Sequence, residues 1–560
     1  MKSFHLWTIQ TLLLSLAGSA NGQVHQPEHD LLLPPVLEPL DGFARGIVMN
    51  DDVLAVADVL LLAPTGDRRG GVQIYRSVNE EWIHTQTLFA NDHQNVRQFG
   101  SRMLLAGDEL FVSVPQYSTS AGFSFGAVYV FQDSPGGWIQ TQKLTGSLTH
   151  PYEAFGLSIA VDGDSLVIGT PSHEFDPVNS PDAEGIVYEF ERTSNGWQEI
   201  GFIEPTFLLH PYGRFGTSLA LDGDTLVVGD LSEGTPPSFL NGHGAAWIFA
   251  RSSTGWDLRV RLTPPSILEL KGFGHGVQLH QGRLFVSSPA VSYSQVAGFG
   301  MVRMYDQSGP PAIDDGWQLQ QTISGSDGSN RNFFGQAFEV HGDWLFASAM
   351  RASYPQSEVG GGYLFKETAA GWVEASRLLP VTSGRFFGSH AAFNGSVVAL
   401  GSGDGSLLPG NSGRVAFFRR PVEFANECLA VPNSSGQSGK LFPTGSQTAT
   451  DNDFVLVASA LPEDSFGMVL VGRDPALLLG AYGSLGILCL DPMTLGMVRQ
   501  SVRVTGEAGF MAMPVDLSSV PTNPVQSILA GETWRFQVWY RDKIPNHVSN
   551  MTEAISITFE

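Results

Sequence analysis

The chain has 560 residues, which is too long for one ordinary core and predicts several units or a repeat array. It holds 31 Lys and Arg against 55 Asp and Glu, a formal net charge of −24, which disfavours nucleic acid and anionic membrane surfaces as partners. Charged residues make up only 15%, aromatic residues 11%, and 64 residues are glycine, which predicts an all-β protein with many tight turns.

Residues 1–22 are typical of an export signal. Lys2 supplies a positive start, residues 12–16 form a short apolar run, and small residues follow, so cleavage is expected near Ala20 or Gly22. A buried strand is the alternative interpretation of the same run. No later stretch reaches about 18 uninterrupted apolar residues, so no transmembrane segment is expected. The mature protein is predicted to be secreted or to lie at the cell surface.

A repeat of fifty to sixty residues is marked by the pair Phe-Gly. After each pair come a tight turn (often Gly-Asp), an apolar strand, a variable loop and a third strand that opens with glycine. Residues 126–131 alternate with the period of two expected of a β-strand. A fourth strand starts at a tryptophan in six copies. The pairs begin at Phe99, Phe155, Phe215, Phe273, Phe334 and Phe387, with a degenerate Phe43-Ala44 before them, and the tryptophans are Trp82, Trp138, Trp197, Trp256, Trp317 and Trp372.

Seven four-stranded units predict a seven-bladed β-propeller over residues 31–420, with each Phe buried between adjacent blades. The seventh unit lacks a tryptophan strand and ends in Arg419-Arg420-Pro421. The apolar segment that begins at Leu31 lies where a fourth strand would precede the first Phe. We therefore expect the N-terminal strand 31–40 to complete the last blade, which removes an exposed edge.

The repeat stops before residues 426–560, where strand-like runs continue. In residues 534–540, Trp534, Phe536 and Tyr540 share one face of a strand with Val538, and the segment is predicted to be a separate C-terminal β-sandwich. The two cysteines, Cys428 and Cys489, are predicted to form a disulfide in an exported protein. Two buried free thiols are the alternative.

The succession of Phe-Gly, Gly-Asp and an apolar strand that ends in a small residue and proline resembles the FG-GAP repeat, as in Thr170-Pro171 and Ser288-Pro289. This repeat builds integrin α-subunit heads and occurs in many secreted bacterial proteins. The resemblance covers about residues 31–420 and implies a propeller whose ligand face is the rim of variable loops. Residues 433–436, 488–490 and 539–542 are similar to a C-terminal module of secreted planctomycete-type bacterial proteins, which implies a bacterial origin.

Integrin-type repeats often carry a calcium loop between the first two strands, and such a loop needs about nine or more residues. Here the connections are short turns, Asp162-Gly163-Asp164 and Asp222-Gly223-Asp224, so their carboxylates are expected to cap turns. Zinc spacings, a nucleophile elbow and a phosphate loop are absent from the sequence. Neither a metal, a cofactor nor a catalytic residue is therefore expected.

Variable loops on a rigid scaffold are the usual place for binding. Tyr, Arg and His side chains in such loops favour a protein or glycan partner, which predicts a non-catalytic binding or adhesion module for an extracellular protein or carbohydrate. A polysaccharide-acting enzyme, with acids from several blades meeting at the axial mouth, and a purely structural surface protein are the alternatives. The candidate rim residues are Arg68, Arg69, Tyr117, His173, Glu174, Asp176, Glu233, His243, Tyr293, Arg351 and Tyr354.

Overall fold

A computed structural model describes residues 25–560 except for a set of short segments. Its residues form two compact units, 22–418 and 419–560, and each is described by itself. The segments outside the described residues are 27–29, 33–41, 64–65, 67, 79–80, 93–97, 116–125, 149–153, 172–184, 206–213, 232–242, 266–271, 290–299, 309–313, 327–332, 351–359, 380–386, 403–412, 422–424, 429, 480–483, 492–497, 500–502, 506–508, 521–524 and 543–548.

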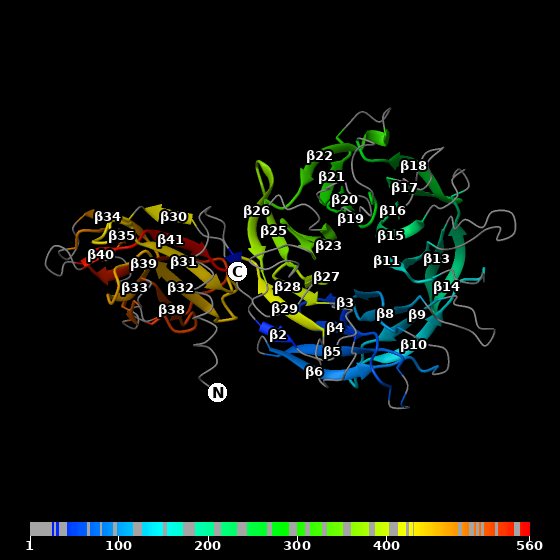
Figure 1. The fold of residues 1–560 in the computed structure, drawn as a ribbon, viewed down its shortest axis with the longest axis horizontal. Helices are drawn as coiled ribbons and strands as arrows, with labels where there is room; N and C mark the ends of the chain where they lie inside the picture. Colours follow the sequence, from blue (N-terminus) through cyan, green and yellow to red (C-terminus); the bar gives the residue numbers. More distant parts are fainter. Residues whose placement is uncertain are drawn as a thin grey trace. The chain divides into compact units, whose positions relative to one another are not determined.

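The first unit is a β-propeller, and its described strands form seven sheets arranged in a ring (Figure 1). Within each repeat, consecutive strands pair antiparallel. The first three sheets consist of β3 (Phe43–Met49), β4 (Val53–Asp58), β5 (Gly71–Val78) and β6 (Glu81–Leu88); of β7 (Met103–Ala106), β8 (Glu109–Val114), β9 (Ala127–Gln132) and β10 (Ile139–Leu144); and of β11 (Ser158–Asp162), β12 (Ser165–Thr170), β13 (Ile186–Thr193) and β14 (Gly196–Ile203).

The next sheets repeat this order, and one short 3-10 helix, Asp314–Gly316, precedes β22. They consist of β15 (Phe215–Asp222), β16 (Thr225–Asp230), β17 (Ala245–Ser252) and β18 (Gly255–Leu262); of β19 (Val277–His280), β20 (Arg283–Ser288), β21 (Met301–Asp306) and β22 (Gln318–Ile323); of β23 (Phe334–His341), β24 (Trp344–Ala349), β25 (Gly362–Thr368) and β26 (Gly371–Leu378); and of β27 (Phe387–Phe393), β28 (Val397–Ser402) and β29 (Arg414–Arg419) with an N-terminal strand.

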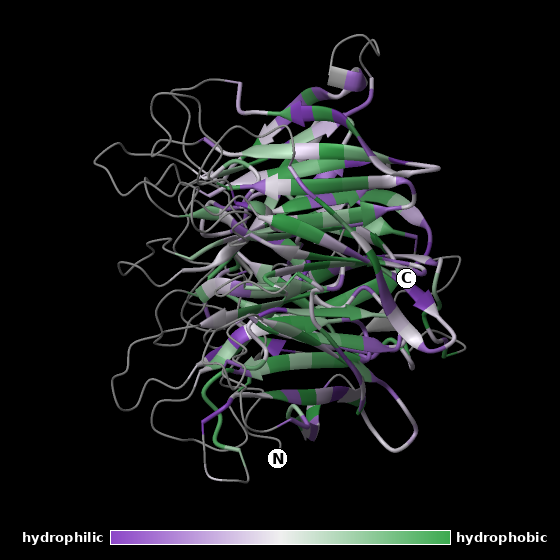
Figure 2. Cartoon of the chain, turned by 90° about the vertical axis from the view of Figure 1, so that its right-hand side faces the viewer, coloured by the Kyte–Doolittle hydropathy of each residue, from purple (hydrophilic) through white to green (hydrophobic). Residues whose placement is uncertain are grey.

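The second strand of each blade is apolar on both faces because both faces are covered by neighbouring sheets. All six residues of β4 and of β8 are buried. The outer strands alternate instead, as in β14, where Trp197 is buried and Gln198 is exposed. Figure 2 shows the same pattern as largely hydrophobic ribbons with hydrophilic residues toward their ends. The all-β propeller of four-stranded blades predicted from the sequence is confirmed.

Each recurrent Phe lies in the core between two sheets, as the repeat predicts. Phe99 is fully buried among side chains of β4, β5, β8 and β9, and it meets Tyr129 edge to face with ring centroids 5.7 Å apart. The glycine that follows has a positive φ in all six pairs, and Ala44 in the degenerate copy also has one, of 64°. The conformation is therefore common to the seven copies, and glycine adopts it at the lowest cost.

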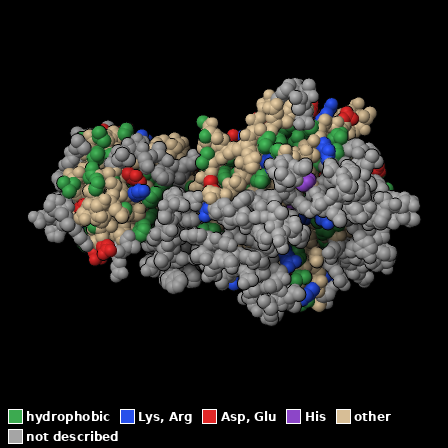
Figure 3. All heavy atoms as spheres, turned by 45° about the horizontal axis from the view of Figure 1, so that its top comes forward, with side chains coloured by type: hydrophobic (Ala, Val, Ile, Leu, Met, Phe, Trp, Pro, Cys, Tyr) green, Lys and Arg blue, Asp and Glu red, His purple; other side chains and the backbone are tan. Residues whose placement is uncertain are grey.

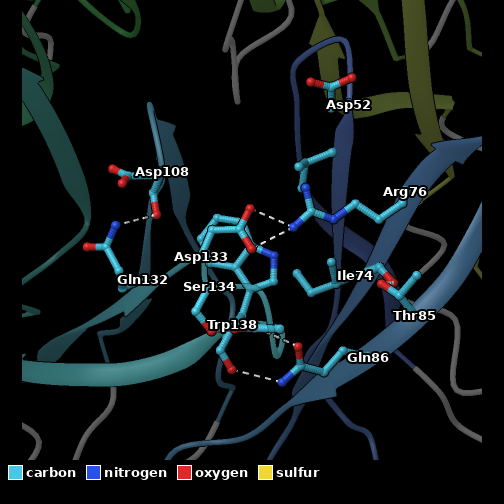
Figure 4. Close-up of polar contacts among 12 residues, drawn as sticks. Asp52, Ile74, Arg76, Thr85, Gln86, Asp108, Gln132, Asp133, Ser134 and Trp138 are labelled. Carbon is cyan, nitrogen blue, oxygen red and sulfur yellow. Dashed lines mark hydrogen bonds and ion pairs between the residues drawn. The ribbon is translucent and has the colours of Figure 1, made fainter.

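Neighbouring blades are joined by a repeated pair of hydrogen bonds between a glutamine and a tryptophan backbone. The Gln86 amide nitrogen donates to the Trp138 carbonyl oxygen at 2.9 Å, and the Trp138 amide nitrogen donates to Gln86 Oε1 at 2.8 Å (Figure 4). Gln142 makes the same two bonds with Trp197, and Gln321 with Trp372. The glutamine lies four residues after the tryptophan of its own blade, so the sequence repeat carries this contact too.

A second repeated contact places an arginine over the tryptophan ring of the same interface and pairs it with a carboxylate. Arg76 donates to both Asp133 oxygens at 2.6 Å and lies 5.9 Å from the centre of the Trp138 ring (Figure 4). Arg192 pairs with Glu109 over Trp197, where its guanidinium carbon is 4.3 Å from the ring centre. Ion pairs of this kind contribute orientation as well as attraction because the fork of the guanidinium fits the carboxylate.

The last sheet receives its outer strand from the beginning of the chain. β2 (Asp30–Leu32) pairs antiparallel with β29, and Leu31 lies opposite Ala416. Side chains of β3, β4 and β5 share a core cluster with Val415 and Phe417 of β29, so the last sheet packs on the first. The remainder of the expected closing strand, residues 33–41, lies outside the described residues, and the domain boundaries 1–22, 31–420 and 426–560 stay predictions.

One element was not expected from the sequence. β1 (His25–Gln26) pairs parallel with β26, which gives the sixth sheet a fifth strand. Two residues carry too little periodicity to be recognised as a strand in advance.

The second unit is a β-sandwich whose larger core lies between its seven-stranded and its three-stranded sheet. Trp534, Phe536, Val538 and Tyr540 are fully buried and share a cluster with Leu456 of the facing sheet, so the predicted face is confirmed. The larger sheet consists of β30 (Ala425–Cys428), β41 (Ala554–Thr558), β39 (Thr533–Arg541), β33 (Phe466–Gly472) and β36 (Val498–Arg499), with β37 (Arg503–Val504) and β40 (Ser549–Met551) at its side; the others are β31 (Lys440–Gly445), β32 (Phe454–Ser459) and β38 (Met511–Val515), and the pair β34 (Pro475–Leu479) and β35 (Ile487–Leu490).

Candidate functional site

The centre of the propeller is built by the residues that directly follow each repeated Phe. Figure 1 shows first strands such as β3, β19, β23 and β27 around the centre of the ring. The second and third residues after each Phe are therefore close to the axis, and all fourteen are neutral or basic. In order of sheet they are Arg45-Gly46, Ser101-Arg102, Leu157-Ser158, Thr217-Ser218, His275-Gly276, Gln336-Ala337 and Ser389-His390.

Five of these side chains, each from a different sheet, form a group that we call the axial cluster: Arg45, Arg102, His275, Gln336 and His390. Gln336 Nε2 lies 3.3 Å from His275 Nε2. Arg102 is near enough to act electrostatically on both His275 and His390, and Arg45 acts on His390. Because Arg102 belongs to the second sheet and His275 to the fifth, this interaction spans the axis.

Both histidines of the axial cluster are neutral at pH 7. Burial, with repulsion from Arg102, lowers the pKa of His275 from 6.5 to about 4. The same causes, with repulsion from Arg45 in addition, lower the pKa of His390 to about 3. Burial also lowers the pKa of Arg102, although its side chain is accessible to solvent. A lowered pKa together with access to solvent is expected of a side chain in the enclosed central channel of a propeller, and not of one on its outer surface.

In the third and fourth sheets, the third residue after the Phe is a serine that forms a hydrogen bond between blades. Ser158 Oγ donates to the Gly216 carbonyl oxygen at 2.6 Å, and Ser218 Oγ donates to the Gly274 carbonyl oxygen at 2.8 Å. Each bond joins one blade to the next. The axial cluster is therefore asymmetric within an otherwise repetitive ring.

The rim connections leave from the same edge of each blade. Phe215, at the start of β15, lies opposite Asp230, at the end of β16, and Phe334 lies opposite Ala349 in the same way. The segment that enters each Phe and the loop that follows each second strand therefore begin side by side. This is the arrangement on which the prediction of a ligand face depends.

Three of the eleven candidate rim residues are described, and they do not come together as one site. The exposed Arg68 donates from Nη1 to the Leu60 carbonyl oxygen at 3.0 Å. The carbonyl oxygens of Arg69 and His243 accept from the amide nitrogens of Phe99 and Phe273, so both residues support blade contacts. The other eight lie outside the described residues: Tyr117, His173, Glu174, Asp176, Glu233, Tyr293, Arg351 and Tyr354.

Cys489 is buried in β35 and is disulfide-bonded. The side chain of Cys428, the other cysteine of the chain, lies outside the described residues. The pairing of Cys428 with Cys489 stays a prediction.

Within the described part of the chain, His, Cys, Asp and Glu side chains nowhere gather in threes as they would around a metal ion. None of the described helical segments has the length and hydrophobicity of a membrane span.

The axial cluster was not recognised from the sequence because its members lie in five different repeats. A signal was present nonetheless. When the seven copies are aligned on Phe, Arg, His and Gln replace small residues at the second or third following position in five of them.

Two sequence comparisons agree with this architecture. Residues 138–190 match the family model described as FG-GAP repeat. Integrin alpha-M of the mouse is 24% identical over 257 residues, which are 44% of this chain and 20% of that protein, so the chain spans about a fifth of its length. A solved structure of the WD40 domain of coronin from Toxoplasma gondii has a TM-score of 0.38 and 10% identity, covering 71% of this chain and 88% of that one. The Phe-Gly sheets and the two sequence matches support an FG-GAP, integrin-α-like β-propeller in this chain.

Proposed function

We propose that the protein is a secreted or cell-surface binding module, without catalysis, for an extracellular protein or glycan. The observation that carries this proposal is the shared edge of the blades, where two sets of connections begin beside each other in the four repeats whose strand register includes the Phe. The sequences of these connections can vary without altering the contacts between blades, which is the property of a binding scaffold.

The chemistry of the blades supports the same proposal. Many of their described charged and aromatic side chains take part in blade contacts, as Arg192, Glu109 and Trp197 do at one interface. Figure 3 shows hydrophobic, acidic and basic side chains on the part of the surface that the described residues form. The apolar run after Lys2 and the likeness to integrin α both favour an exported protein.

A binding screen of the full chain against glycans and extracellular matrix proteins tests the proposal. We expect saturable binding to at least one ligand class, and loss of that binding when segment 172–184 and the corresponding segments of the next two repeats, 232–242 and 290–299, are replaced by Gly-Ser segments of equal length. The matched control replaces Ser194 and Asn195, in the turn at the opposite end of β13 and β14, by alanine and should keep full binding. Absence of binding to every ligand would favour a structural surface protein instead.

A further inference from the structure

The axial cluster carries positive charge that the described residues leave uncompensated. Arg102 donates from Nη1 to the Ser101 carbonyl oxygen at 3.2 Å, a neutral acceptor. Within the described residues, neither Arg45 nor Arg102 forms an ion pair with a carboxylate. The arginines of the blade interfaces behave differently, since Arg76, Arg192 and Arg251 each face a carboxylate within 3.0 Å.

The neighbouring polar groups also have unused hydrogen-bonding capacity. His275 Nδ1 and His390 Nδ1 are buried and have no hydrogen-bond partner. With the Gln336 amide nitrogen donating to His275 Nε2, the ring proton of the neutral imidazole lies on Nδ1, which is then a donor without an acceptor. Buried donors of this kind normally have a partner, and a buried donor without one is unfavourable.

These features indicate which charge a ligand bound at the axial cluster would carry. A cation would be repelled by two guanidinium groups, and an apolar group would leave the polar atoms unsatisfied. An oxyanion supplies both the missing negative charge and several acceptor oxygens, and guanidinium groups bind such oxygens in pairs. Because the chain as a whole carries a net charge of −24, long polyanions are repelled at a distance, which favours a compact anion.

We propose that Arg45 and Arg102, with the other polar side chains of the axial cluster, form a binding site for a compact oxyanion of the sulfate or dicarboxylate type at the axis of the propeller. The site uses none of the candidate rim residues and does not depend on the proposed function. Sulfate offers a tetrahedral group of oxygens, and malonate offers planar carboxylates. Comparing these two free anions therefore shows which kind of group the site prefers.

Titration calorimetry of the full chain with sodium sulfate and with sodium malonate, at constant ionic strength in chloride buffer, tests this site. We expect saturable binding of at least one anion, and at least a tenfold loss of affinity in Arg102→Gln. Arg259→Gln is the matched control because it removes the same charge from an exposed position on β18. It should bind as the wild type does, as should the variant with replaced rim loops.

Thermal unfolding separates binding from a structural role. Sulfate stabilises proteins in general because it is excluded from their surface. The informative quantity is therefore the part of the sulfate-induced rise in unfolding temperature that is lost in Arg102→Gln and kept in Arg259→Gln. Without sulfate or malonate, Arg102→Gln should unfold at the same temperature as the wild type or higher, because one of two like charges is gone. If Arg102→Gln does not fold, Arg45→Gln is measured in its place. Absence of saturable binding, or equal affinity in the wild type and both axial variants, would overturn the proposal.

Discussion

At the scale of single residues, the Phe-Gly pair combines two separate requirements. The ring fills the space between blades, while the next residue has a positive φ and little room around it. A Cβ atom on Gly100 would lie 2.6 Å from the Cβ of Ala57, so this position excludes side chains for steric as well as conformational reasons. The pair is therefore a stronger mark of the fold than the Gly-Asp turn that follows it.

Gly100→Ala should destabilise the propeller more than Gly107→Ala does. Both glycines have positive φ, 95° and 59°, and a left-handed conformation costs an alanine about 1–2 kcal/mol. At Gly107 nothing lies within 4 Å of the added atom, so only that cost applies. At Gly100 the contact with Ala57 adds to it, and we expect a loss of about 3 kcal/mol or more. Chemical denaturation of the two variants measures the difference, and equal losses would contradict the steric argument.

At the scale of elements, the contacts between blades repeat less completely than the strands do. Three interfaces carry the Gln-Trp bonds, whereas Gly201 and Val260 occupy the equivalent glutamine position in the third and fourth blades. Trp256 instead donates from Nε1 to Glu189 at 3.0 Å. The interfaces therefore contact their tryptophans in different ways, and the cost of losing a contact depends on the interface.

Gln142→Ala should lower the free energy of unfolding by about 2 kcal/mol, because it leaves the Trp197 amide nitrogen and carbonyl oxygen unpaired in a buried interface. Gln140 is the matched control on the same strand, since its Oε1 accepts from the exposed Asn91 amide at 2.9 Å, a bond that water can replace. Gln140→Ala should cost less than about 0.5 kcal/mol. Thermal and denaturant unfolding compare the two, and a similar effect of both substitutions would show that the paired bonds contribute nothing specific.

The strands were predictable because their alternation and their tight turns are local signals. The axial cluster was not, because Arg45 and His390 are neighbours only after the ring closes. Gln537 gives a further example. The alternation of β39 placed it on the face opposite Trp534, yet it is fully buried, since its amide nitrogen donates to the carbonyl oxygens of Ile487 and Thr552 and its Oε1 accepts from the Cys489 amide. A buried polar side chain with all partners from distant segments carries no local signal.

At the scale of the whole molecule, the ring depends on residues from both ends of the propeller segment. Leu32 of β2 packs against the cluster that joins the last sheet to the first, and Trp82 stacks on Phe417 with ring centroids 6.3 Å apart. A Cβ atom on Gly413 would lie 1.9 Å from the Phe43 carbonyl oxygen, so the two backbones meet closely at this junction. An open ring would expose both the edge of β29 and this apolar surface.

Deletion of residues 23–32 should therefore destabilise the propeller far more than deletion of residues 23–29. The shorter deletion removes β1, which pairs over two residues with the edge of the sixth sheet, and leaves β2 in place. The longer deletion also removes the ladder from Asp30 to Leu32 and the packing of Leu32, worth about 2 kcal/mol for the side chain alone.

Unfolding temperature and size-exclusion chromatography of the two variants provide the comparison. We expect the longer deletion to melt at a clearly lower temperature and to associate through the exposed edge of β29, whereas the shorter one should stay close to the intact chain in both measurements. Closure by β2 is wrong if the two deletions behave alike. Since the ladder itself spans only three residues, a large difference between them would show that the stability of the whole ring is concentrated at the junction of its two ends.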